Sequence, residues 1–557
     1  MPEIIDNNNM NDATLSPMQQ FYHNKTVFLT GGTGFLGKIC MEKLLRSCQI
    51  DTIYVLIRSK KGKDIATRME DICNDVVFSK LKQQDKEEKF RHKIVPIEGD
   101  CSLPGLGMSA SDRRKLIENC QIILHVAATV RFDEKLKLAL AINVNGTKEI
   151  MQLSKQTKSL VACVHVSTAY ANCNRSNIDE RIYRTKLSGS NAIKMAECFD
   201  EKTLEQITPT LIGDWPNTYT FTKALAEDLV KSMCKRDNDG ENNNLTEKTM
   251  NKIINTDKII ENNNFEEVKS TQQDEMLPVT IFRPAIVIPT VKEPIVGWID
   301  NMYGPTGIIV GVGAGLLRVF YGKKENNAEL VPVDMVVNGI LASAYDIAHN
   351  YRNYSEPPVY NYVASPQNPI TWNDYCEYGV EHGAKMPMMK SIWYYTFNMS
   401  ANRFLVSILT FLYHTLPAFL IDTGLVVIQR RPKMLQVYRK IHRFCDVIYY
   451  FTNGQWYFTN QNVQQLWNKL TPQDQQLFFF NMAELNWSEA INMSMFGIRT
   501  YLMKEDPNNI PEALKRTQRL KILHFATVYS IYTALLYFLY MILSKFFLPI
   551  LSTSNKI

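Results

Sequence analysis

Short runs of apolar residues, each ending in small or polar residues, recur along the first half of the chain. They are Val27–Leu29, Ile53–Ile57, Ile94–Ile97, Ile122–Val126, Val161–Val166 and, further on, Val279–Phe282. Segments with the apolar spacing of helices separate the first five runs. Buried strands that alternate with helices are typical of a parallel sheet covered on both faces. The pattern therefore predicts an α/β fold with a doubly wound parallel sheet.

The first apolar run breaks into closely spaced glycines, and a helix pattern follows. The stretch reads Thr30-Gly31-Gly32-Thr33-Gly34-Phe35-Leu36-Gly37. Gly31 and Gly34 can adopt backbone angles closed to other residues, and Gly37 lets the helix pack close to the sheet. The helix N-terminus would offer free N–H groups to a pyrophosphate. The stretch predicts a Rossmann-type dinucleotide site, although a plain tight turn can carry the same glycines.

The residues that follow the next strands predict which dinucleotide binds. An acidic residue after the second strand would bind the ribose hydroxyls of NAD, but this chain has Arg58, which suits a 2′-phosphate. Asp100, Ala127 and Ala128 follow the third and fourth strands and would line the adenosine half of the cleft. We therefore expect NADPH as the cofactor.

Candidate catalytic side chains gather in two places. Ser167 and Thr168 follow the fifth strand, whereas Tyr219 and Lys223 are four residues apart and so share one face of a helix. An ammonium group beside a phenol favours ionisation, so we expect the pKa of Tyr219 to lie below its usual value of about 10. The phenol can then act as the acid for a carbonyl that accepts a hydride. Taken alone, Tyr-x-x-x-Lys is also common on solvated helix faces.

Together these motifs resemble those of the extended short-chain dehydrogenase/reductases and, more narrowly, the fatty acyl-CoA reductases. The resemblance runs from about Lys25 to the C-terminus, through Thr30–Gly37, Asn143–Thr147, His165–Tyr170, Asn217–Glu227, Ile281–Pro284, Gly297–Asn301 and Val331–Asn338. It implies that Tyr219 and Lys223 are the catalytic pair, with Thr168, and next Ser167, as the hydroxyl partner. Lys223 would also reach the nicotinamide ribose, and Asn143 is a further candidate for cofactor contact.

The resemblance implies NADPH-dependent reduction of a long-chain acyl-CoA, through an aldehyde, to a primary fatty alcohol for wax ester or ether lipid synthesis. Two alternatives stay open. A membrane-bound hydroxysteroid dehydrogenase or sugar epimerase of the same fold would use the same Tyr and Lys on a secondary alcohol. A membrane scaffold that binds NADP(H) without chemistry would not need the pair Tyr219 and Lys223, which argues against it.

The 557 residues exceed what one hydrophobic core usually supports. We expect a polar N-terminal segment over residues 1–24 and an extended Rossmann reductase domain over 25–371. Within that domain, residues 235–277 are rich in Asn, Lys, Glu and Asp, and predict a disordered surface insertion. Residues 372–523 are helical and aromatic in pattern and predict a helical C-terminal domain, without showing which residues touch substrate.

The segment Phe525–Ser544 carries no charged residue and is about as long as a bilayer core requires. Basic residues precede it at Lys515, Arg516, Arg519 and Lys521, which predicts a single-pass transmembrane anchor over 524–551 with the catalytic domain in the cytosol. A buried core helix is the alternative. The resemblance points to the peroxisome or the endoplasmic reticulum. A second apolar run, Arg403–Leu420, is interrupted by Pro417 and is not predicted to span.

Composition excludes several other partners. The formal net charge is only +6, and basic residues are interspersed with acidic ones, so nucleic acid is not predicted as a partner. The 11 Cys residues lack the spacing of a metal site, and residues 1–20 lack the apolar stretch of a signal peptide. We expect reduced thiols and no metal. The sequence does not predict the oligomeric state.

Overall fold

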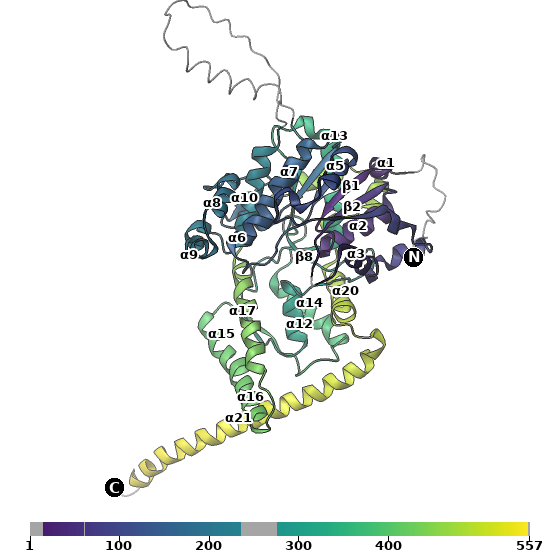
Figure 1. Ribbon diagram of the computed structural model, residues 1–557. Coiled ribbons are helices and arrows are strands. Elements are labelled where there is room, and N and C mark those ends of the chain that lie inside the picture. Colours follow the sequence, from purple (N-terminus) through teal and green to yellow (C-terminus); the bar gives the residue numbers. More distant parts are fainter. Residues whose placement is uncertain (1–14, 61, 236–275, 555–557) are drawn as a thin grey trace, which may run out of the picture.

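A computed structural model of the chain describes residues 15–60, 62–235 and 276–554 (Figure 1). The predicted insertion 235–277 therefore lies, apart from its ends, outside the described residues. Lys235 and Met276 form an antiparallel bridge, and the Leu277 N–H donates to the Cys234 carbonyl at 2.7 Å. The chain thus enters and leaves this segment at one place on the surface.

A seven-stranded parallel sheet forms the centre of the upper part in Figure 1, with the strand order β11-β7-β5-β4-β1-β2-β3. The strands are β1 (Thr26–Thr30), β2 (Thr52–Ile57), β3 (Ile94–Glu98), β4 (Ile122–His125), β5 (Ala162–Val166), β7 (Val279–Pro284) and β11 (Val359–Tyr362). Six of them match the predicted runs to within two residues. The strand order reverses between β1 and β4, and ligands of such sheets bind beyond the carboxyl ends of the strands at that point. The predicted doubly wound fold is confirmed.

Helices cover both faces of this sheet. One face carries α2 (Phe35–Ser47) and α13 (Val333–Asn350), and the other carries α5 (Ala110–Asn119), α7 (Gly146–Gln156) and α10 (Thr218–Met233). The side chain of Asn217 caps α10 by accepting a hydrogen bond from the Thr220 N–H at 2.9 Å. This cap fixes the start of the helix and so places Tyr219 in its first turn.

The described part of the predicted polar N-terminal segment, residues 15–24, packs against the rest of the protein. Residues Pro17–Tyr22 form α1, which begins with a capping box between Ser16 and Gln19. The Tyr22 hydroxyl donates to the Leu341 carbonyl at 2.7 Å, and its ring is fully buried. Residues 15–22 are therefore part of the folded core.

The remaining elements connect the strands of the sheet or form the lower part of the molecule in Figure 1, which we call the lower lobe. The further helices are α3 (Ile65–Cys73), α4 (Ser79–Gln84), α6 (Leu136–Ala139), α8 (Gly189–Cys198), α9 (Glu201–Ile212), α12 (Pro305–Gly313), α14 (Trp372–Lys385), α18 (Gln461–Lys469), α19 (Pro472–Leu477) and α20 (Trp487–Gly497). Three short parallel pairs join β8 (Ile286–Ile288) to β10 (Leu330–Pro332), β9 (Val319–Tyr321) to β12 (Asn398–Ser400), and β6 (Asn177–Ile178) to β13 (Tyr457–Phe458).

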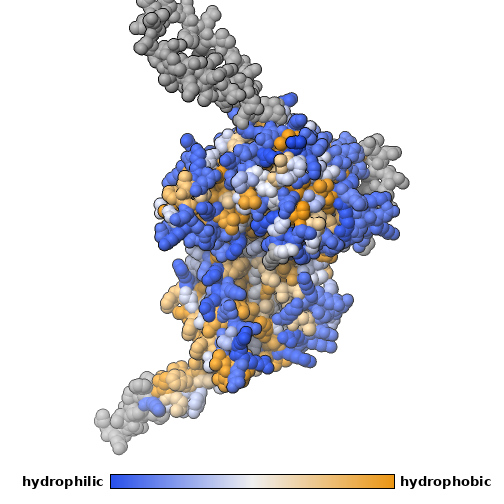
Figure 2. Space-filling model, viewed as in Figure 1, coloured by the Kyte–Doolittle hydropathy of each residue, from blue (hydrophilic) through white to orange (hydrophobic). Residues whose placement is uncertain are grey.

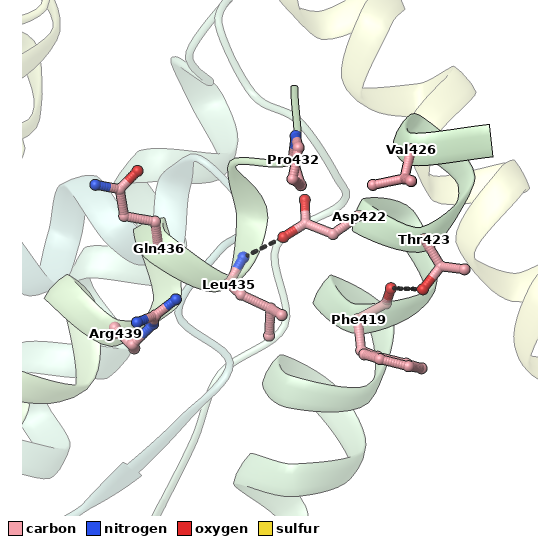
Figure 3. A pocket seen from close by; sticks show the side chains of 8 residues that line it. All are labelled: Phe419, Asp422, Thr423, Val426, Pro432, Leu435, Gln436 and Arg439. Atoms are coloured by element: carbon pink, nitrogen blue, oxygen red, sulfur yellow. Dashed lines mark hydrogen bonds between the residues drawn. The ribbon is translucent and has the colours of Figure 1, made fainter. Parts of the chain in front are cut away.

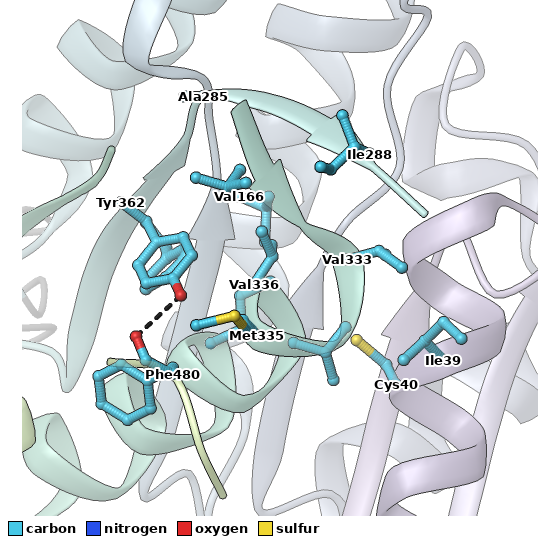
Figure 4. Close-up of a cluster of buried hydrophobic side chains, with 14 of the residues drawn as sticks. Ile39, Cys40, Val166, Ala285, Ile288, Val333, Met335, Val336, Tyr362 and Phe480 are labelled. Atoms are coloured by element: carbon cyan, nitrogen blue, oxygen red, sulfur yellow. Dashed lines mark hydrogen bonds between the residues drawn. The ribbon is translucent and has the colours of Figure 1, made fainter. Parts of the chain in front are cut away.

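The helical C-terminal part shares its core with the Rossmann part. Trp456, Phe458 and Phe480 belong to the same buried apolar cluster as the residues of β1. Figure 4 shows Phe480 beside Tyr362 of β11, whose hydroxyl donates to the Phe480 carbonyl at 2.8 Å. Conversely, α12 precedes residue 372 in sequence but lies beside α14 in the lower lobe (Figure 1). The spatial division of the molecule therefore does not follow a boundary between residues 371 and 372.

Two long apolar helices lie in the lower lobe. In the first, α15 (Arg403–Thr410) continues through a π-turn, Phe411–Thr415, into α16 (Leu416–Val427). Pro417 does not break it, because it lies in the first turn of α16, directly after the π-turn that shifts the hydrogen bonding. A connecting turn leads to α17 (Met434–Asn453). The second is α21 (Ile510–Ser554). Of the described residues, Arg403–Val427 and Pro507–Lys545 are long and apolar enough to cross a membrane.

Candidate active site

The turn between β1 and α2 has the predicted shape at two of its three key glycines. Gly31 has φ +78°, and a Cβ there would lie 2.7 Å from the Ala127 nitrogen. A Cβ on Gly37 would lie 2.2 Å from the Gly31 carbonyl oxygen, so only glycine permits this packing. Gly34, however, has φ −92° and ψ 175°, an extended conformation open to any residue, so the expectation of a special angle there is wrong. It is the N-cap of α2 and provides no side-chain cap for the helix N–H groups.

The other residues of the turn and the strand ends surround this opening. Gly32 is buried, and a Cβ on it would meet the Val55 side chain at 2.4 Å. Thr33, Phe35 and Leu36 are partly exposed, as are Ala127 and Ala128 after β4. The predicted cofactor residues of β1, α2 and β4 are therefore brought to one edge of the sheet.

Thr30 ends β1 and is buried within a hydrogen-bond chain. Its Oγ1 accepts from the Ala127 N–H at 3.2 Å and lies 2.8 Å from His125 Nδ1. His125 Nε2 lies 3.1 Å from the hydroxyl of Thr147, which donates to the Asn143 carbonyl at 2.7 Å. Thr147 therefore accepts from Nε2–H, and Thr30 donates to Nδ1. Burial lowers the pKa of His125 to about 3, so the ring is neutral. Thr30 supports the floor of the cleft.

Arg58 and Asp100 lie at the ends of the neighbouring strands β2 and β3. Arg58 Nη1 lies 3.4 Å from Asp100 Oδ2, and 52% of the Arg58 side chain is exposed. Asp100 also accepts from the N–H and hydroxyl of Ser102 at 2.9 and 2.8 Å. Burial opposes ionisation, but these hydrogen bonds keep the pKa of Asp100 below its usual value. Arg68 of α3 donates to the Arg58 carbonyl, so two guanidinium groups stand at this strand end.

Tyr219 and Thr168 meet at the carboxyl end of β5, as the sequence predicts. Tyr219 is half-buried, and its ring stacks on Phe132 with centroids 5.6 Å apart. Thr168 accepts from the Tyr170 N–H at 3.3 Å and makes a side-chain hydrogen bond to Tyr219. Burial raises the pKa of Tyr219 to about 12, and the Thr168 hydrogen bond offsets only part of this. The predicted depression of this pKa is wrong, and the phenol is protonated at neutral pH.

Lys223 lies one turn further along α10 and is 2% exposed. Its ammonium group donates to the carbonyl of Val166, the last residue of β5, at 2.8 Å. Burial lowers the pKa of Lys223 to about 8, although the Glu227 carboxylate raises it in part. The ammonium group therefore ties α10 to the sheet.

Ser167 is brought to the strand end, but its hydroxyl is already engaged. It donates to Glu227 Oε1 at 2.5 Å. Glu227 also receives hydrogen bonds from Arg283 of β7, Nε to Oε1 at 2.8 Å and Nη2 to Oε2 at 2.6 Å. Both partners of this ion pair are at most 1% exposed. Ser167 thus belongs to a buried polar network, and Thr168 is the hydroxyl beside the phenol.

Asn143 is also committed to internal hydrogen bonds. Its Oδ1 accepts from the Thr129 N–H at 2.9 Å, and its Nδ2 donates to the Thr129 carbonyl at 3.3 Å and to the Thr222 hydroxyl at 3.0 Å. Because the side chain is 1% exposed, it joins the loop after β4 to α10 instead of facing the cleft. Asn143 therefore positions other residues of the site.

An aromatic wall, made by Phe132, Tyr170, Phe451 and Trp456, stands beside Tyr219. Phe451 of α17 lies 5.2 Å from Phe132 and 5.1 Å from Tyr170 between ring centroids, and Trp456 lies 5.3 Å from Tyr170. Trp456 Nε1 donates to the Cys173 carbonyl at 2.9 Å. Nothing in the sequence places residues 451–456 beside residue 219. Glu227 and Arg283, by contrast, lie in segments that carry the family resemblance. Their positions in those segments could have marked them as residues of the site.

The residues present fit a dinucleotide. A side chain at Gly31 would fill the space against Ala127, and α2 begins without a side-chain cap, so its N–H groups can bind a pyrophosphate. Arg58 and Arg68 lie at the end of β2, where this fold binds the adenosine ribose. A protonated phenol with a hydroxyl partner lies at the carboxyl end of β5. This combination defines a nicotinamide-dependent reductase of the short-chain dehydrogenase class.

Comparisons with known proteins narrow this class. Residues 29–239 and 266–340 match a family model for an NAD-binding domain described as male sterility protein, and residues 413–505 match a second model with that description. The chain is 50% identical to "Fatty acyl-CoA reductase wat" of Drosophila melanogaster over 95% of this chain and 94% of that protein. It is 35% identical to "Fatty acyl-CoA reductase 1" of Homo sapiens over 91% and 90% of the two chains. The chain belongs to the fatty acyl-CoA reductase family and is an oxidoreductase.

Solved structures share the fold at low identity. The terminal reductase domain of the myxalamid biosynthetic pathway aligns with a TM-score of 0.51 and 18% identity, over 86% of this chain and 90% of that chain. The reductase domain of a nonribosomal peptide synthetase from Mycobacterium tuberculosis aligns with a TM-score of 0.51 and 16% identity, over 87% and 96%. These likenesses concern the Rossmann-type architecture alone.

Proposed function

We propose that this protein uses NADPH to reduce long-chain fatty acyl-CoA, through an aldehyde, to a primary alcohol. The observation that carries the proposal is the protonated phenol of Tyr219, which Thr168 holds at the carboxyl end of β5. The relatives at 50% and 35% identity are named for the same reaction class, which supports the choice of substrate. The apolar aromatic wall beside Tyr219 suits a fatty chain.

The chain's own residues would act on the substrate oxygen. A bound reduced nicotinamide supplies the hydride. Tyr219 and Thr168 hydrogen-bond to the thioester carbonyl oxygen and stabilise the charge that develops on it. Collapse of this adduct breaks the C–S bond and leaves an aldehyde, and CoA departs as the thiolate, which takes a proton from solvent. In the second reduction, for which a second NADPH would supply the hydride, Tyr219 gives its proton to the aldehyde oxygen, which becomes the alcohol hydroxyl, and regains a proton from solvent.

Four further residues prepare the site for this chemistry. Lys223, held at Val166, would reach the nicotinamide ribose, and its ammonium group would supply positive charge near the reacting oxygen. Arg58 and Arg68 support NADPH over NADH, since a 2′-phosphate would lie between two guanidinium groups. Asp100 would then orient Arg58 through their contact.

The apolar helix α21 supports a membrane location. We propose that it anchors the protein, with the catalytic part in the cytosol, on the peroxisome or the endoplasmic reticulum. NADPH and acyl-CoA are both available on that side. A primary alcohol released there would supply wax ester or ether lipid synthesis.

The test is incubation of purified full-length protein in detergent with NADPH or NADH and a panel of acyl-CoAs, sterols and nucleotide sugars. Mass spectrometry identifies the products. We expect fatty alcohol from long-chain acyl-CoA, with NADPH preferred, and none from the Tyr219→Phe variant. Turnover of only sterols or nucleotide sugars would contradict the proposal.

A further inference from the structure

The helix formed by α15 and α16 exposes an apolar surface much larger than a water-facing helix carries. Between Phe404 and Ile428, thirteen large hydrophobic side chains are 37–77% exposed. They are Phe404, Leu405, Ile408, Phe411, Leu412, Tyr413, Leu416, Phe419, Leu420, Ile421, Val426, Val427 and Ile428. Only Asp422 is charged in this stretch. Exposed apolar patches of this extent mark a site of contact with a protein or a membrane.

Asp422 does not interrupt this surface, because it faces the start of α17. Its carboxylate accepts from the N–H groups of Lys433, Met434 and Leu435, each at 2.9 Å, and so caps α17. Figure 3 shows Asp422 turned toward Leu435, with Phe419 on the same helix. A cavity of about 500 Å³ between α16 and α17 is lined mostly by apolar surface of these helices. The helix is thus fixed to α17 and, through α15, to β9 and β12, and its remaining surface is exposed.

Positive charge borders the apolar surface. The turn after α16 exposes Arg430, Arg431 and Lys433, and the first turns of α17 expose Arg439 and Lys440. An uncharged apolar helix that ends in a cluster of cations has the chemistry of an interfacial membrane segment, whose cations meet anionic lipid headgroups.

The surface adjoins the apolar run of α21. His414 Nε2 accepts from the Arg318 N–H at 3.0 Å, and the Arg318 guanidinium lies 5.8 Å from the Trp393 ring centroid. Trp393 Nε1 in turn donates to His524 Nδ1 of α21 at 3.0 Å. Figure 2 shows hydrophobic surface gathered at the lower end of the molecule, where Figure 1 places α15, α16 and α21. Trp393 and the following Tyr394 are residues typical of a membrane interface.

A helix of 25 residues is about 37 Å long, enough to cross a bilayer core of about 30 Å, but its connections oppose crossing. If α15–α16 crossed, α17 would have to return through the hydrocarbon with Arg439, Lys440 and Arg443 exposed. Each such cation costs about 2.5 to 3.5 kcal/mol at the centre of a bilayer. The helix therefore fits one leaflet, parallel to the surface.

We propose that α15–α16 is a second membrane contact, embedded in the leaflet that faces the catalytic part and bound to anionic lipid through Arg430, Arg431 and Lys433. The proposed membrane contact also gives a role to α17. This helix starts at the basic turn and reaches the aromatic wall at Phe451, 5.2 Å from Phe132. This helix therefore connects the proposed membrane contact to the residues that pack beside Tyr219.

The first experiment uses full-length protein in phosphatidylcholine–phosphatidylserine vesicles. The photoreactive residue p-benzoylphenylalanine replaces Phe411 or Phe419, both exposed on the helix, or Phe199, which is 42% exposed and far from it as the matched control. We expect crosslinks to lipid from positions 411 and 419 at least tenfold above position 199. Crosslinks to a second copy of the chain, or yields equal to the control, overturn the proposal.

The second experiment isolates the anionic contact. In the full-length chain, Leu535→Arg and Leu539→Arg disable α21, and vesicle flotation then reports the remaining contact. Adding Arg430→Gln and Arg431→Gln should weaken binding to phosphatidylserine vesicles about 30-fold. Binding to pure phosphatidylcholine should not change. Equal binding with and without the two arginines overturns the role of the basic turn. Neither experiment measures reduction, so its failure leaves the proposed function untouched.

Discussion

The Lys223 ammonium group donates a hydrogen bond to the Val166 carbonyl at 2.8 Å and so joins α10 to the end of β5. Thr168 follows Val166 by two residues, and Tyr219 precedes Lys223 by one turn. Together with the hydrogen bond from Ser167 to Glu227, the Lys223 hydrogen bond therefore joins the two chain segments that carry Thr168 and Tyr219. The charge on that ammonium group is also the first property of the site that pH would change.

The pH dependence of reduction should report Lys223. Its pKa is lowered to about 8 by burial, so the ammonium form is lost as pH rises through about 8, whereas Tyr219 stays protonated to about 12. We expect kcat/KM for acyl-CoA to fall about tenfold per pH unit above that pKa. The guanidinium group of a Lys223→Arg variant does not lose its proton near pH 8. The remaining activity of this variant should therefore not fall as the pH rises through 8. A flat wild-type profile up to pH 10 would show that the charge is not needed.

Tyr219→Phe should remove the acid and keep the stacking on Phe132. Because the glycine turn is untouched, NADPH binding measured by fluorescence should be unchanged, while reduction falls by about 10² or more. Thr168→Val should lose less, since it removes the hydroxyl partner but keeps Tyr219 as the proton donor. Near wild-type turnover in Tyr219→Phe would exclude the phenol as the proton donor.

Arg58→Asp should change cofactor preference. It replaces a guanidinium group with a carboxylate beside Asp100, so a 2′-phosphate would lose a charge-assisted hydrogen bond worth about 1.5 to 3 kcal/mol. NADPH affinity should fall at least about tenfold, and NADH affinity should be spared. Titration of both cofactors checks this, with Lys60→Asp on the neighbouring loop as the control. Equal losses for both cofactors would assign Arg58 a structural role.

Glu227→Gln should destabilise the protein. Breaking a buried ion pair costs about 3 to 5 kcal/mol, because the Arg283 charge stays buried without its partner. Thermal unfolding in detergent should begin several degrees lower. The matched control is Glu201→Gln, which breaks an ion pair with Lys135 whose side chains are more than half exposed and should have almost no effect. Equal shifts in the two variants would exclude a special role for the buried pair.

Two charges in α21 should remove the attachment to membranes that resists an alkaline carbonate wash, and leave only the weaker contact through α15–α16. Leu535 and Leu539 are 58% and 51% exposed, and each central Arg costs about 2.5 to 3.5 kcal/mol on insertion. The Leu535→Arg/Leu539→Arg variant should no longer pellet with membranes after an alkaline carbonate wash. Leu103→Arg/Leu138→Arg, at exposed positions of the Rossmann part, should pellet like wild type. Persistent pelleting of the α21 variant would place the integral segment elsewhere.

Six of the seven strands could be predicted from sequence because each is a short apolar run with a clear end, whereas the edge strand β11, which carries Asn361 among its apolar residues, was missed. Tyr219 and Thr168 were found because each lies at a position that fixed local geometry defines: one helix turn before Lys223, and a strand end. The pKa of Tyr219 could not be predicted this way. It depends on how closely Phe132 and the neighbouring chain exclude water, which spacing does not report.

Two other misses come from contacts between residues far apart in sequence, and a third comes from a local irregularity of the backbone. Asn143 lies in a motif, but only its hydrogen bond to Thr222 shows that its side chain is used internally. Pro417 suggested a broken helix because the π-turn that accommodates it has no sequence signature. Phe451 joins the site through packing alone, and no local pattern of apolar residues predicts which distant ring it will meet.

The pairing of β6 with β13 cannot form until long after the ribosome has synthesised β6. Ile178 and its partner Phe458 are 280 residues apart. At about 5 to 20 residues per second, a ribosome needs about 14 to 56 s to add the second strand after the first. Throughout that interval Tyr170 and the edge of β6 lack the aromatic cover that Trp456 later provides. The nascent chain therefore has to be kept from associating with others, and chaperone supply should limit the yield of active enzyme.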